Sequence, residues 1–271
     1  MRDIVLVELE RLVLHEETIP ENLDRLTLQL DEDGALWAPV VVDRETQVVI
    51  DGVHRVTALR KLGCRFACAY LVDYRNPAIK IKRWVRTISK PLDVQKTIEV
   101  AEELDLKLVP TRSYTMYEDG NSPILRFEDN SNYMLALHRS IIQAFDMLRK
   151  FEQLLKAKGF KVEYETEREA EEKLMRGDAA ASLHPPKISK RQVVDNAKSG
   201  NVLPCKATRH IIPGRPLGVD VPLQLLRDPS LSLEEANERI SVMLSLRRFE
   251  KLPPGTIWRG LRYDEDIYVL K

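Results

Sequence analysis

The sequence contains few cysteines, and none of them is spaced as a metal or disulfide framework requires. Its 271 residues include three cysteines, Cys64, Cys68 and Cys205, and no C-x-x-C pair. An odd number without that spacing argues against a disulfide scaffold and against a zinc site. Cys64 and Cys68 are four positions apart, and we expect both to be buried as small apolar groups.

The chain also lacks an excess of charge and a long apolar run. Its 42 basic residues balance its 42 acidic residues, whereas a dedicated nucleic-acid binder usually has a basic excess. Charged Arg2, Asp3 and Glu8 interrupt the first apolar run, so we expect no signal peptide. No segment reaches the length of a membrane span. We therefore expect a cytoplasmic protein without nucleic-acid or membrane partners, either a monomer or a small homo-oligomer.

Hydrophobic residues make up 44% of the sequence. This share is sufficient for a sizeable core in one large domain or two smaller ones. Strand-like and helix-like segments alternate, which predicts an α/β (α+β) fold. Residues 80–88 alternate like a strand with a basic outer face, and residues 201–219 resemble a loop. The pattern changes near Lys90, so we expect one domain over 1–90 and another over 91–271.

One stretch, VVIDGVHRVTALRKLG, joins a strand directly to a helix. The apolar residues 48–50 predict a buried strand, and Asp51-Gly52 is a turn pair. Apolar residues then recur at helical spacing, which predicts a helix over 53–62 that ends at Gly63. His54 and Arg55 therefore lie in the first turn of a helix, directly after an acidic residue and a glycine.

This combination suits a phosphate-binding site. A helix N-terminus favours anions, Gly52 allows the backbone to approach a ligand closely, and Arg55 carries a guanidinium suited to phosphate oxygens. His54 could donate to an oxygen or relay a proton. Without a metal ion, the Asp51 carboxylate would repel phosphate, but a magnesium ion can bridge the carboxylate and the phosphate. The alternative from spacing alone is that Asp51 only caps the helix and Arg55 is a solvated surface residue.

The pattern D-G-x-H-R-x-x-A-L-x-x-L-G resembles the signature of the ParB/sulfiredoxin superfamily, in which this junction handles nucleotide phosphates. Other segments resemble its free serine kinases, which convert L-serine to O-phospho-L-serine for cysteine and serine metabolism. These segments are His15-Glu16, Gly34 to Pro39, Trp84 and Ala207 to His210. The resemblance implies a ParB-like N-terminal lobe and a second α/β lobe that together form a cleft.

The resemblance also implies roles for individual residues. Glu16 would be the general base for the serine hydroxyl, and Asp51 would hold Mg²⁺ or orient that hydroxyl. Residues 52–55 would bind the phosphates. At Val53, where the family often has histidine, only the backbone N–H can contribute. Gly34 and Trp37 would border the nucleotide base.

A third group of residues would hold the amino acid, by the same resemblance. Thr208, Arg209 and His210 would bind zwitterionic serine, Trp84 would form a wall of the pocket, and Arg215 is a further candidate. In general, a tryptophan such as Trp84 more often belongs to a core, and an arginine such as Arg209 more often forms a surface ion pair.

The chain has no Walker A motif, and relatives use either ATP or ADP; its length and C-terminal region favour ATP. The alternative is a ParB-like nucleotide-dependent DNA-binding or regulatory protein, but neither a helix-turn-helix after the motif nor a basic surface is evident. A sulfiredoxin would need a reactive cysteine beside the motif, and position 53 is valine.

Overall fold

The computed structural model describes residues 3–112, 122–136 and 140–271, which form two compact units. Unit 1 consists of residues 1–80, 190–202 and 210–271, and unit 2 of residues 81–189 and 203–209. The change of sequence pattern near Lys90 predicted one boundary at that point. The division differs because the C-terminal segment packs on the N-terminal sheet, where Asn237 bonds to both backbone polar groups of Leu6.

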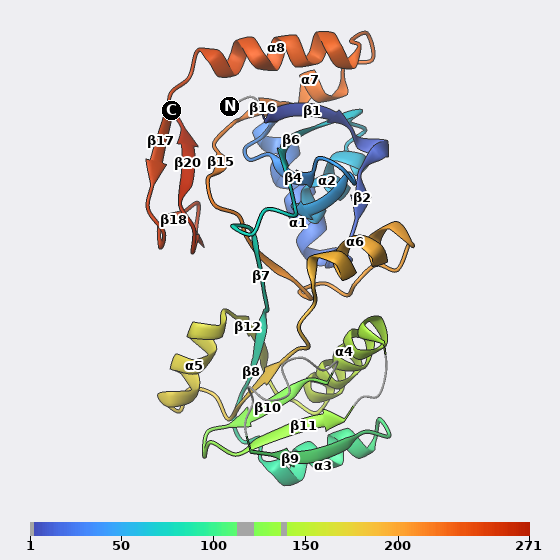
Figure 1. Cartoon of the computed structure of the whole chain (residues 1–271), viewed down its shortest axis with the longest axis vertical. Helices are drawn as coiled ribbons and strands as arrows, with labels where there is room; N and C mark the ends of the chain where they lie inside the picture. Colours follow the sequence, from blue (N-terminus) through green and yellow to red (C-terminus); the bar gives the residue numbers. More distant parts are fainter. Residues whose placement is uncertain (1–2, 113–121, 137–139) are drawn as a thin grey trace. The chain divides into compact units, whose positions relative to one another are not determined.

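Unit 1 is built on a mixed five-stranded sheet in the order β1-β6-β4-β5-β2 (Figure 1). β6 is antiparallel to β1 and parallel to β4, whereas β5 is antiparallel to β4 and parallel to β2. The parallel pairing of β2 and β5 brings two loops to the same edge of the sheet. The strands are β1 (Ile4–Glu8), β2 (Val13–Leu14), β4 (Val40–Asp43), β5 (Val48–Asp51) and β6 (Phe66–Val72).

The helices of unit 1 pack on this sheet and on each other, with α1 against α2 and α8 against β1. α1 has proline at its start and a left-handed glycine, Gly34, at its end, as expected for such a sequence. A 3₁₀ turn at Leu9–Arg11 follows β1. The helices are α1 (Pro20–Asp33), α2 (Val53–Lys61), α6 (Lys190–Lys198), α7 (Leu223–Arg227) and α8 (Leu233–Ser245).

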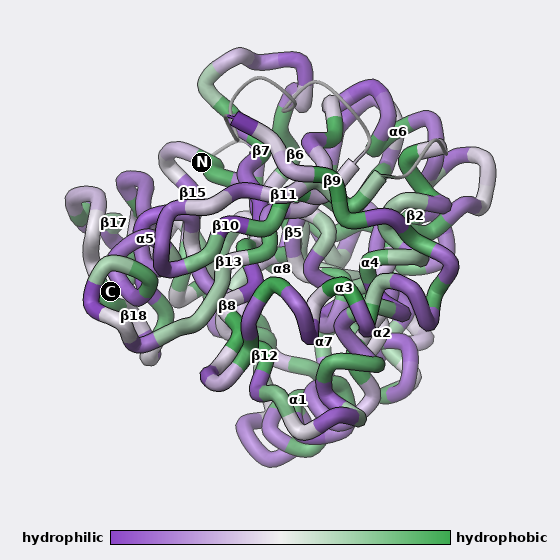
Figure 2. The backbone as a smooth tube through the Cα atoms, turned by 90° about the horizontal axis from the view of Figure 1, so that it is seen from below, coloured by the Kyte–Doolittle hydropathy of each residue, from purple (hydrophilic) through white to green (hydrophobic). Residues whose placement is uncertain are grey.

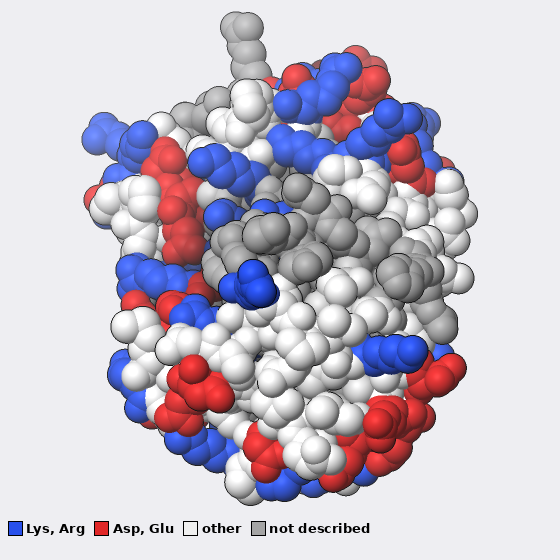
Figure 3. All heavy atoms as spheres, turned by 60° about the horizontal axis from the view of Figure 1, so that its bottom comes forward, with Lys and Arg blue, Asp and Glu red and all other residues white. Residues whose placement is uncertain are grey.

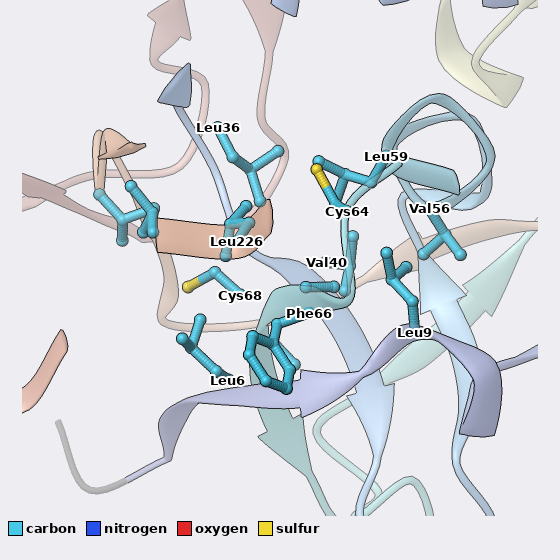
Figure 4. Packing of buried hydrophobic residues seen from close by; sticks show 14 of the residues in the cluster. Leu6, Leu9, Leu36, Val40, Val56, Leu59, Cys64, Phe66, Cys68 and Leu226 are labelled. Atoms are coloured by element: carbon cyan, nitrogen blue, oxygen red, sulfur yellow. The ribbon is translucent and has the colours of Figure 1, made fainter. Parts of the chain in front are cut away.

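The core of unit 1 contains the two cysteines that the sequence analysis expected to be buried. Cys64 and Cys68 pack with Phe66 and Leu226 among the aliphatic side chains between sheet and helices (Figure 4). Burial raises the pKa of the Cys68 thiol to about 12. That expectation is confirmed, and both thiols serve packing.

The C-terminal part of unit 1 adds short strands. β3 (Ala35–Leu36) pairs with β16 (Val221–Pro222), and a hairpin joins β18 (Ile257–Trp258) to β19 (Leu261–Arg262). A third sheet has the order β15-β20-β17, in which β15 and β20 are parallel. Its strands are β15 (Arg215–Leu217), β17 (Phe249–Leu252) and β20 (Ile267–Leu270).

Residues 201–219 are therefore not simply a loop. β14 (Arg209–Ile211) and β15 both lie within this range. The expectation failed because each strand has three residues, too few to show an alternating pattern.

Unit 2 contains an antiparallel six-stranded sheet in the order β12-β8-β13-β10-β11-β9. The long helix α4 begins with a capping box formed by Ser140 and Gln143. The strands are β8 (Val85–Ile88), β9 (Lys107–Thr111), β10 (Ile124–Phe127), β11 (Asn132–Ala136), β12 (Val162–Glu165) and β13 (Ala181–His184). The helices are α3 (Val94–Glu102), α4 (Ile141–Ala157) and α5 (Glu167–Met175).

The sequence pattern predicted one strand over 80–88, but the structure has two, β7 (Lys80–Lys82) and β8. The predicted basic outer face is also wrong at Arg86, and Arg83, which has the opposite parity, is buried as well. Arg83 and Arg86 are 8% and 3% exposed, because Glu167 and Glu152 neutralise them. Alternation alone does not show that an arginine has a buried carboxylate as partner.

Hydrophobic and hydrophilic stretches alternate along the backbone, including along α8 (Figure 2). On the face shown in Figure 3, basic and acidic side chains are intermixed around an area of uncharged residues. No helix among the described residues is both long enough and apolar enough to cross a membrane.

Candidate active site

The strand-to-helix junction has the form predicted from the sequence. β5 ends at Asp51, Gly52 is the N-cap with a φ of 97°, and α2 begins at Val53. The first backbone N–H groups of a helix have no partner within it and carry a partial positive charge. Because glycine has no side chain with which to cap them, the start of α2 is suited to an anionic ligand.

The parallel pairing of β2 and β5 brings Glu16 to the same sheet edge as Asp51. Leu14 lies opposite Val49 in this register, so two further residues along each strand lead to Glu16 and Asp51. The Nδ1–H of His15 donates to the Val49 carbonyl at 2.5 Å, which extends the association beyond β2. Two carboxylates thus come from neighbouring loops at one edge.

Two arginines bind the Asp51 carboxylate. Arg55 Nη2 lies 2.7 Å and Arg215 Nη1 2.9 Å from Asp51 Oδ2. Burial acts to raise the pKa of Asp51, but the positive charges of Arg215 and Arg55 outweigh it and lower the pKa to about 2. Asp51 is consequently ionised at neutral pH, with 36% of its side chain exposed.

Arg55 is not the solvated surface residue of the alternative interpretation, since only 11% of its side chain is exposed. Its Nη1 donates to the carbonyls of Ala38 and Pro39 at 3.1 and 2.6 Å. A Cβ at Gly52 would lie 2.9 Å from Arg55 Nη2 and 3.0 Å from Val40 Cγ1. Glycine at this position therefore makes room for the Arg55 side chain as well as permitting the positive φ.

His54 connects the loop that carries Glu16 to α2. Its Nε2 accepts a hydrogen bond from the backbone N–H of Ile19 at 2.9 Å, and Ile19 is the N-cap of α1. A neutral ring that accepts through Nε2 carries its proton on Nδ1. His54 thus has a positioning contact in addition to the phosphate role expected from the sequence.

His210 lies in a buried cluster in the same unit. Its Nε2 is 2.6 Å from the hydroxyl of Tyr74, and its ring centroid is 5.6 Å from that of His15. Burial, reinforced by His15, lowers the pKa of His210 well below 6.5. Burial also raises the pKa of Tyr74. The histidine and the phenol are therefore both neutral at pH 7.

Trp84 and Arg209 contact each other within unit 2. Lys206 Nζ lies 4.2 Å and Arg209 Cζ 5.8 Å from the centroid of the Trp84 ring, in cation–π geometry. Trp84 is half-buried, and Thr208 is 6% exposed. Arg86 Nη1 donates to the carbonyls of Trp84 and Lys206, which fixes the two backbones relative to each other.

The predicted serine-binding residues are thus divided between the units. Trp84, Thr208 and Arg209 belong to unit 2, whereas His210 and Arg215 belong to unit 1. Of these five, the structure brings Trp84 into contact with Arg209, and separately brings Arg215 into contact with His210 and with Asp51.

Trp37 lies in an aromatic and guanidinium cluster of unit 1. Its ring centroid is 5.4 Å from that of Trp258, and the Cζ atoms of Arg55 and Arg259 are each 5.6 Å from it. Its buried indole N–H makes no hydrogen bond with the described residues. Gly34 ends α1 with a φ of 63°, so its immediate role is the left-handed turn before Trp37.

Sequence reasoning missed three residues that organise the site. Glu265 binds Arg215, Tyr74 bonds to His210, and Arg86 fixes the backbone around Trp84. Neither Glu265 nor Tyr74 belongs to a recognisable motif. Arg86 could have been suspected, since it interrupts the buried strand β8 with a charge that needs a partner.

Magnesium fits this arrangement only together with a nucleotide. Among the described residues, no three His, Cys, Asp or Glu side chains are grouped closely enough to hold a metal ion. Protein-bound Mg²⁺ is commonly held by one or two carboxylates, with substrate phosphates and water as the other ligands. Ionised and partly exposed, Asp51 suits the carboxylate role beside the start of α2.

No model of a known protein family matches the chain. An ATP-dependent L-serine kinase of Desulfurococcus mucosus is 29% identical over 82% of the chain and 91% of its own length. The ADP-dependent L-serine kinase SerK of Thermococcus kodakarensis is 22% identical over 83% of the chain and 93% of its own length. A solved free serine kinase, a glutamate variant in complex with AMP, superposes with a TM-score of 0.70. It is 21% identical, and the match covers 83% of this chain and 94% of that one.

These similarities span most of the chain and agree with kinase rather than DNA-binding function, so the ParB-like DNA-binding alternative is not favoured. The expected α/β fold is confirmed, and so is the resemblance of this chain to free serine kinases.

Proposed function

We propose that this protein is a free L-serine kinase, which transfers the terminal phosphoryl group of ATP or ADP to the hydroxyl of L-serine and forms O-phospho-L-serine. The observation that carries the proposal is the similarity to the Desulfurococcus enzyme over 82% of the chain. The geometry is compatible with it, because two carboxylates meet at one sheet edge beside a helix N-terminus.

Phosphoryl transfer requires a hydroxyl in line with the phosphorus atom and a base that accepts its proton. In the proposed mechanism Glu16 takes the proton of the serine hydroxyl. The backbone N–H groups at Val53 and His54 bind the phosphates. Arg55, held by Asp51, adds positive charge where negative charge develops in the transition state.

Mg²⁺ would be held by Asp51 and the nucleotide phosphates, and would supply charge neutralisation to the transferred group. Asp51 is already ionised at neutral pH, so it needs no deprotonation to serve this purpose. Its second proposed role is to orient the serine hydroxyl.

Recognition of serine is assigned to the remaining candidates. Arg209 would pair with the serine carboxylate, Thr208 would add a hydrogen bond, and Trp84 would provide an apolar wall. His210 and Arg215 are further candidates for serine recognition.

Gly34 and Trp37 are proposed to border the nucleotide base. ATP is the proposed donor, because the relative that uses ATP is 29% identical and the relative that uses ADP is 22% identical. A cytoplasmic location is proposed because Cys64 and Cys68 are buried thiols that serve packing.

The test is direct. The purified protein is incubated with L-serine, Mg²⁺ and either ATP or ADP, and phosphoserine is measured together with ADP or AMP. We expect phosphoserine and a stoichiometric amount of ADP from ATP. Nucleotide hydrolysis without phosphoserine, or no turnover with either nucleotide, would refute the proposal.

A further inference from the structure

Glu265 is a buried acidic residue that binds Arg215. It is 5% exposed, and its Oε1 accepts hydrogen bonds from Arg215 Nε at 2.9 Å and from the backbone N–H of Ile212 at 3.2 Å. A carboxylate this deeply buried normally requires a charged partner. That partner here is Arg215, which also binds Asp51.

The C-terminal sheet explains why these two side chains meet. β15 begins at Arg215, which lies opposite Ile267 of the parallel strand β20. Glu265 is two residues before Ile267, and Gly214 N–H donates to the carbonyl of Asp266 at 2.9 Å. Arg215 and Glu265 therefore lie at the same end of paired strands, and the position of one depends on that of the other.

Arg215 uses each of its three nitrogens for a different partner. Nε donates to Glu265, Nη1 to Asp51 and Nη2 to the carbonyl of His210, the last at 3.3 Å. A guanidinium is planar and its donors have fixed directions. The hydrogen bond to Glu265 consequently sets the direction in which Nη1 approaches Asp51.

The charges along this path are balanced. Arg55, Asp51, Arg215 and Glu265 form a continuous ion-pair chain of two positive and two negative residues. Without Glu265, Asp51 is the only carboxylate of this ion-pair chain that remains to pair with Arg55 and Arg215. We expect the Asp51 carboxylate to be displaced from the position it has beside α2.

On the basis of the proposed function, we propose that Glu265 is a positioning residue, which acts through Arg215 to hold the Asp51 carboxylate in its working position. Glu265 is buried and is not among the residues proposed to bind either substrate. A purely structural role, in which Glu265 only anchors residues 212–215 to the C-terminal sheet, is the competing explanation.

The experiment compares Glu265→Met, Asp51→Asn, the double variant and wild type. Methionine has a similar length but no acceptor for Arg215. We expect Glu265→Met to lower kcat by about 10- to 100-fold, the range for groups that orient a ligand side chain. Because Arg215 is also a candidate for serine recognition, the KM for serine should rise, but by a smaller factor than kcat falls.

The binding of ADP in the presence of Mg²⁺, measured by calorimetry, supplies a readout that does not depend on serine. Each single variant should weaken this binding, and the double variant should bind as Asp51→Asn does, because the effect of Glu265 passes through Asp51. Additive losses, or a change in KM alone, would overturn the proposal in favour of the anchor.

Two further variants serve as a conservative replacement of Glu265 and as a control for the loss of a buried carboxylate. Glu265→Gln keeps the Oε1 acceptor, so it should retain more activity than Glu265→Met, and it replaces that variant in every comparison if methionine prevents folding. Asp43→Asn is the matched control: Asp43 is also 5% exposed and accepts hydrogen bonds from Tyr74 N–H and Thr46. It should lower stability, but it should reduce kcat much less than Glu265→Met does, because Asp43 has no contact with Asp51 or Arg215 in the structure.

The two proposals fail in different ways. If the wild type binds ADP but does not phosphorylate serine, the proposed function is wrong and the binding cycle still decides the role of Glu265. If the wild type neither binds ADP nor phosphorylates serine, both proposals are wrong.

Discussion

Asp51 and Arg215 are 164 positions apart in the sequence and are joined by a hydrogen bond of 2.9 Å. The contact links the strand-to-helix junction to the first residue of β15. It also leaves the acidic residue of the motif with two arginine partners, since Arg55 binds the same oxygen.

Replacement of either proposed catalytic carboxylate should abolish turnover in a folded protein. Glu16→Gln cannot accept the hydroxyl proton, and Asp51→Asn cannot hold Mg²⁺ as a carboxylate does. We expect phosphoserine formation to fall at least about 100-fold in each, the lower range for loss of a general base. Glu17→Gln, an exposed neighbour, is the control and should remain active. Near-normal turnover in both variants would refute the proposed mechanism.

Arg209→Ala should mainly weaken the binding of serine. The guanidinium is proposed to pair with the serine carboxylate in both ground state and transition state, so its loss should raise the KM for serine about tenfold or more with a smaller change in kcat. Arg191→Ala, whose side chain is 90% exposed on α6, is the control. Steady-state kinetics with serine as the varied substrate measure the effect, and an unaltered KM would exclude the assigned role.

Gly52→Ala should be more destabilising than a comparable substitution elsewhere. A left-handed conformation costs a non-glycine residue about 1–2 kcal/mol, and the contacts of 2.9 and 3.0 Å with Arg55 and Val40 add an overpacking cost of about 1–3 kcal/mol. Gly200→Ala has a similar φ of 73° but no atom within 4 Å of the added carbon. Denaturant unfolding gives the loss of stability for each variant, and the difference between the two losses is the packing cost at Gly52. Equal losses would show that there is no such packing cost.

The stability of the protein should decline below about pH 6.5 in part because of His210. Its pKa is lowered in the folded state, first by burial and then by His15. The unfolded chain therefore binds a proton that the folded chain does not, and stability present above pH 6.5 is lost as the pH falls, by up to about 1.4 kcal/mol per pH unit. His210→Gln should show a smaller decline between pH 6.5 and 5 than the wild type; an identical slope would contradict burial of a neutral histidine.

The three cysteines should differ in reactivity. Burial raises the pKa of Cys64, and raises that of Cys68 to about 12, whereas Cys205 is only half-buried. Because the thiolate is the reactive form, an aromatic disulfide reagent should modify Cys205 first and the other two only on unfolding. The Cys205→Ser variant should lack the fast phase. Rapid modification of Cys68 in the native protein would be inconsistent with its packing.

Local sequence patterns predicted the elements that a periodic arrangement of apolar residues can specify. The strand before Asp51 and the helix after Gly52 are both present, and the burial of Cys64 and Cys68 is as expected. Patterns were less informative where a buried charge or a very short strand is involved, as at Arg86 and in β15. Burial of Arg86 depends on Glu152, 66 positions away, and such pairing leaves no local trace.

The sequence by itself determined the strand-to-helix junction at residues 48–61 with its turn at Asp51-Gly52, because a strand, a turn and the start of a helix depend on neighbouring residues. Its motifs also carried the resemblance to free serine kinases. Only the tertiary structure decided which side chains surround the Asp51 carboxylate. Arg215 and Glu265 reach it because β15 and β20 pair in the C-terminal sheet of unit 1. Hydrogen bonds between residues so far apart in the chain are set by the packing of whole elements, which no short stretch of sequence encodes.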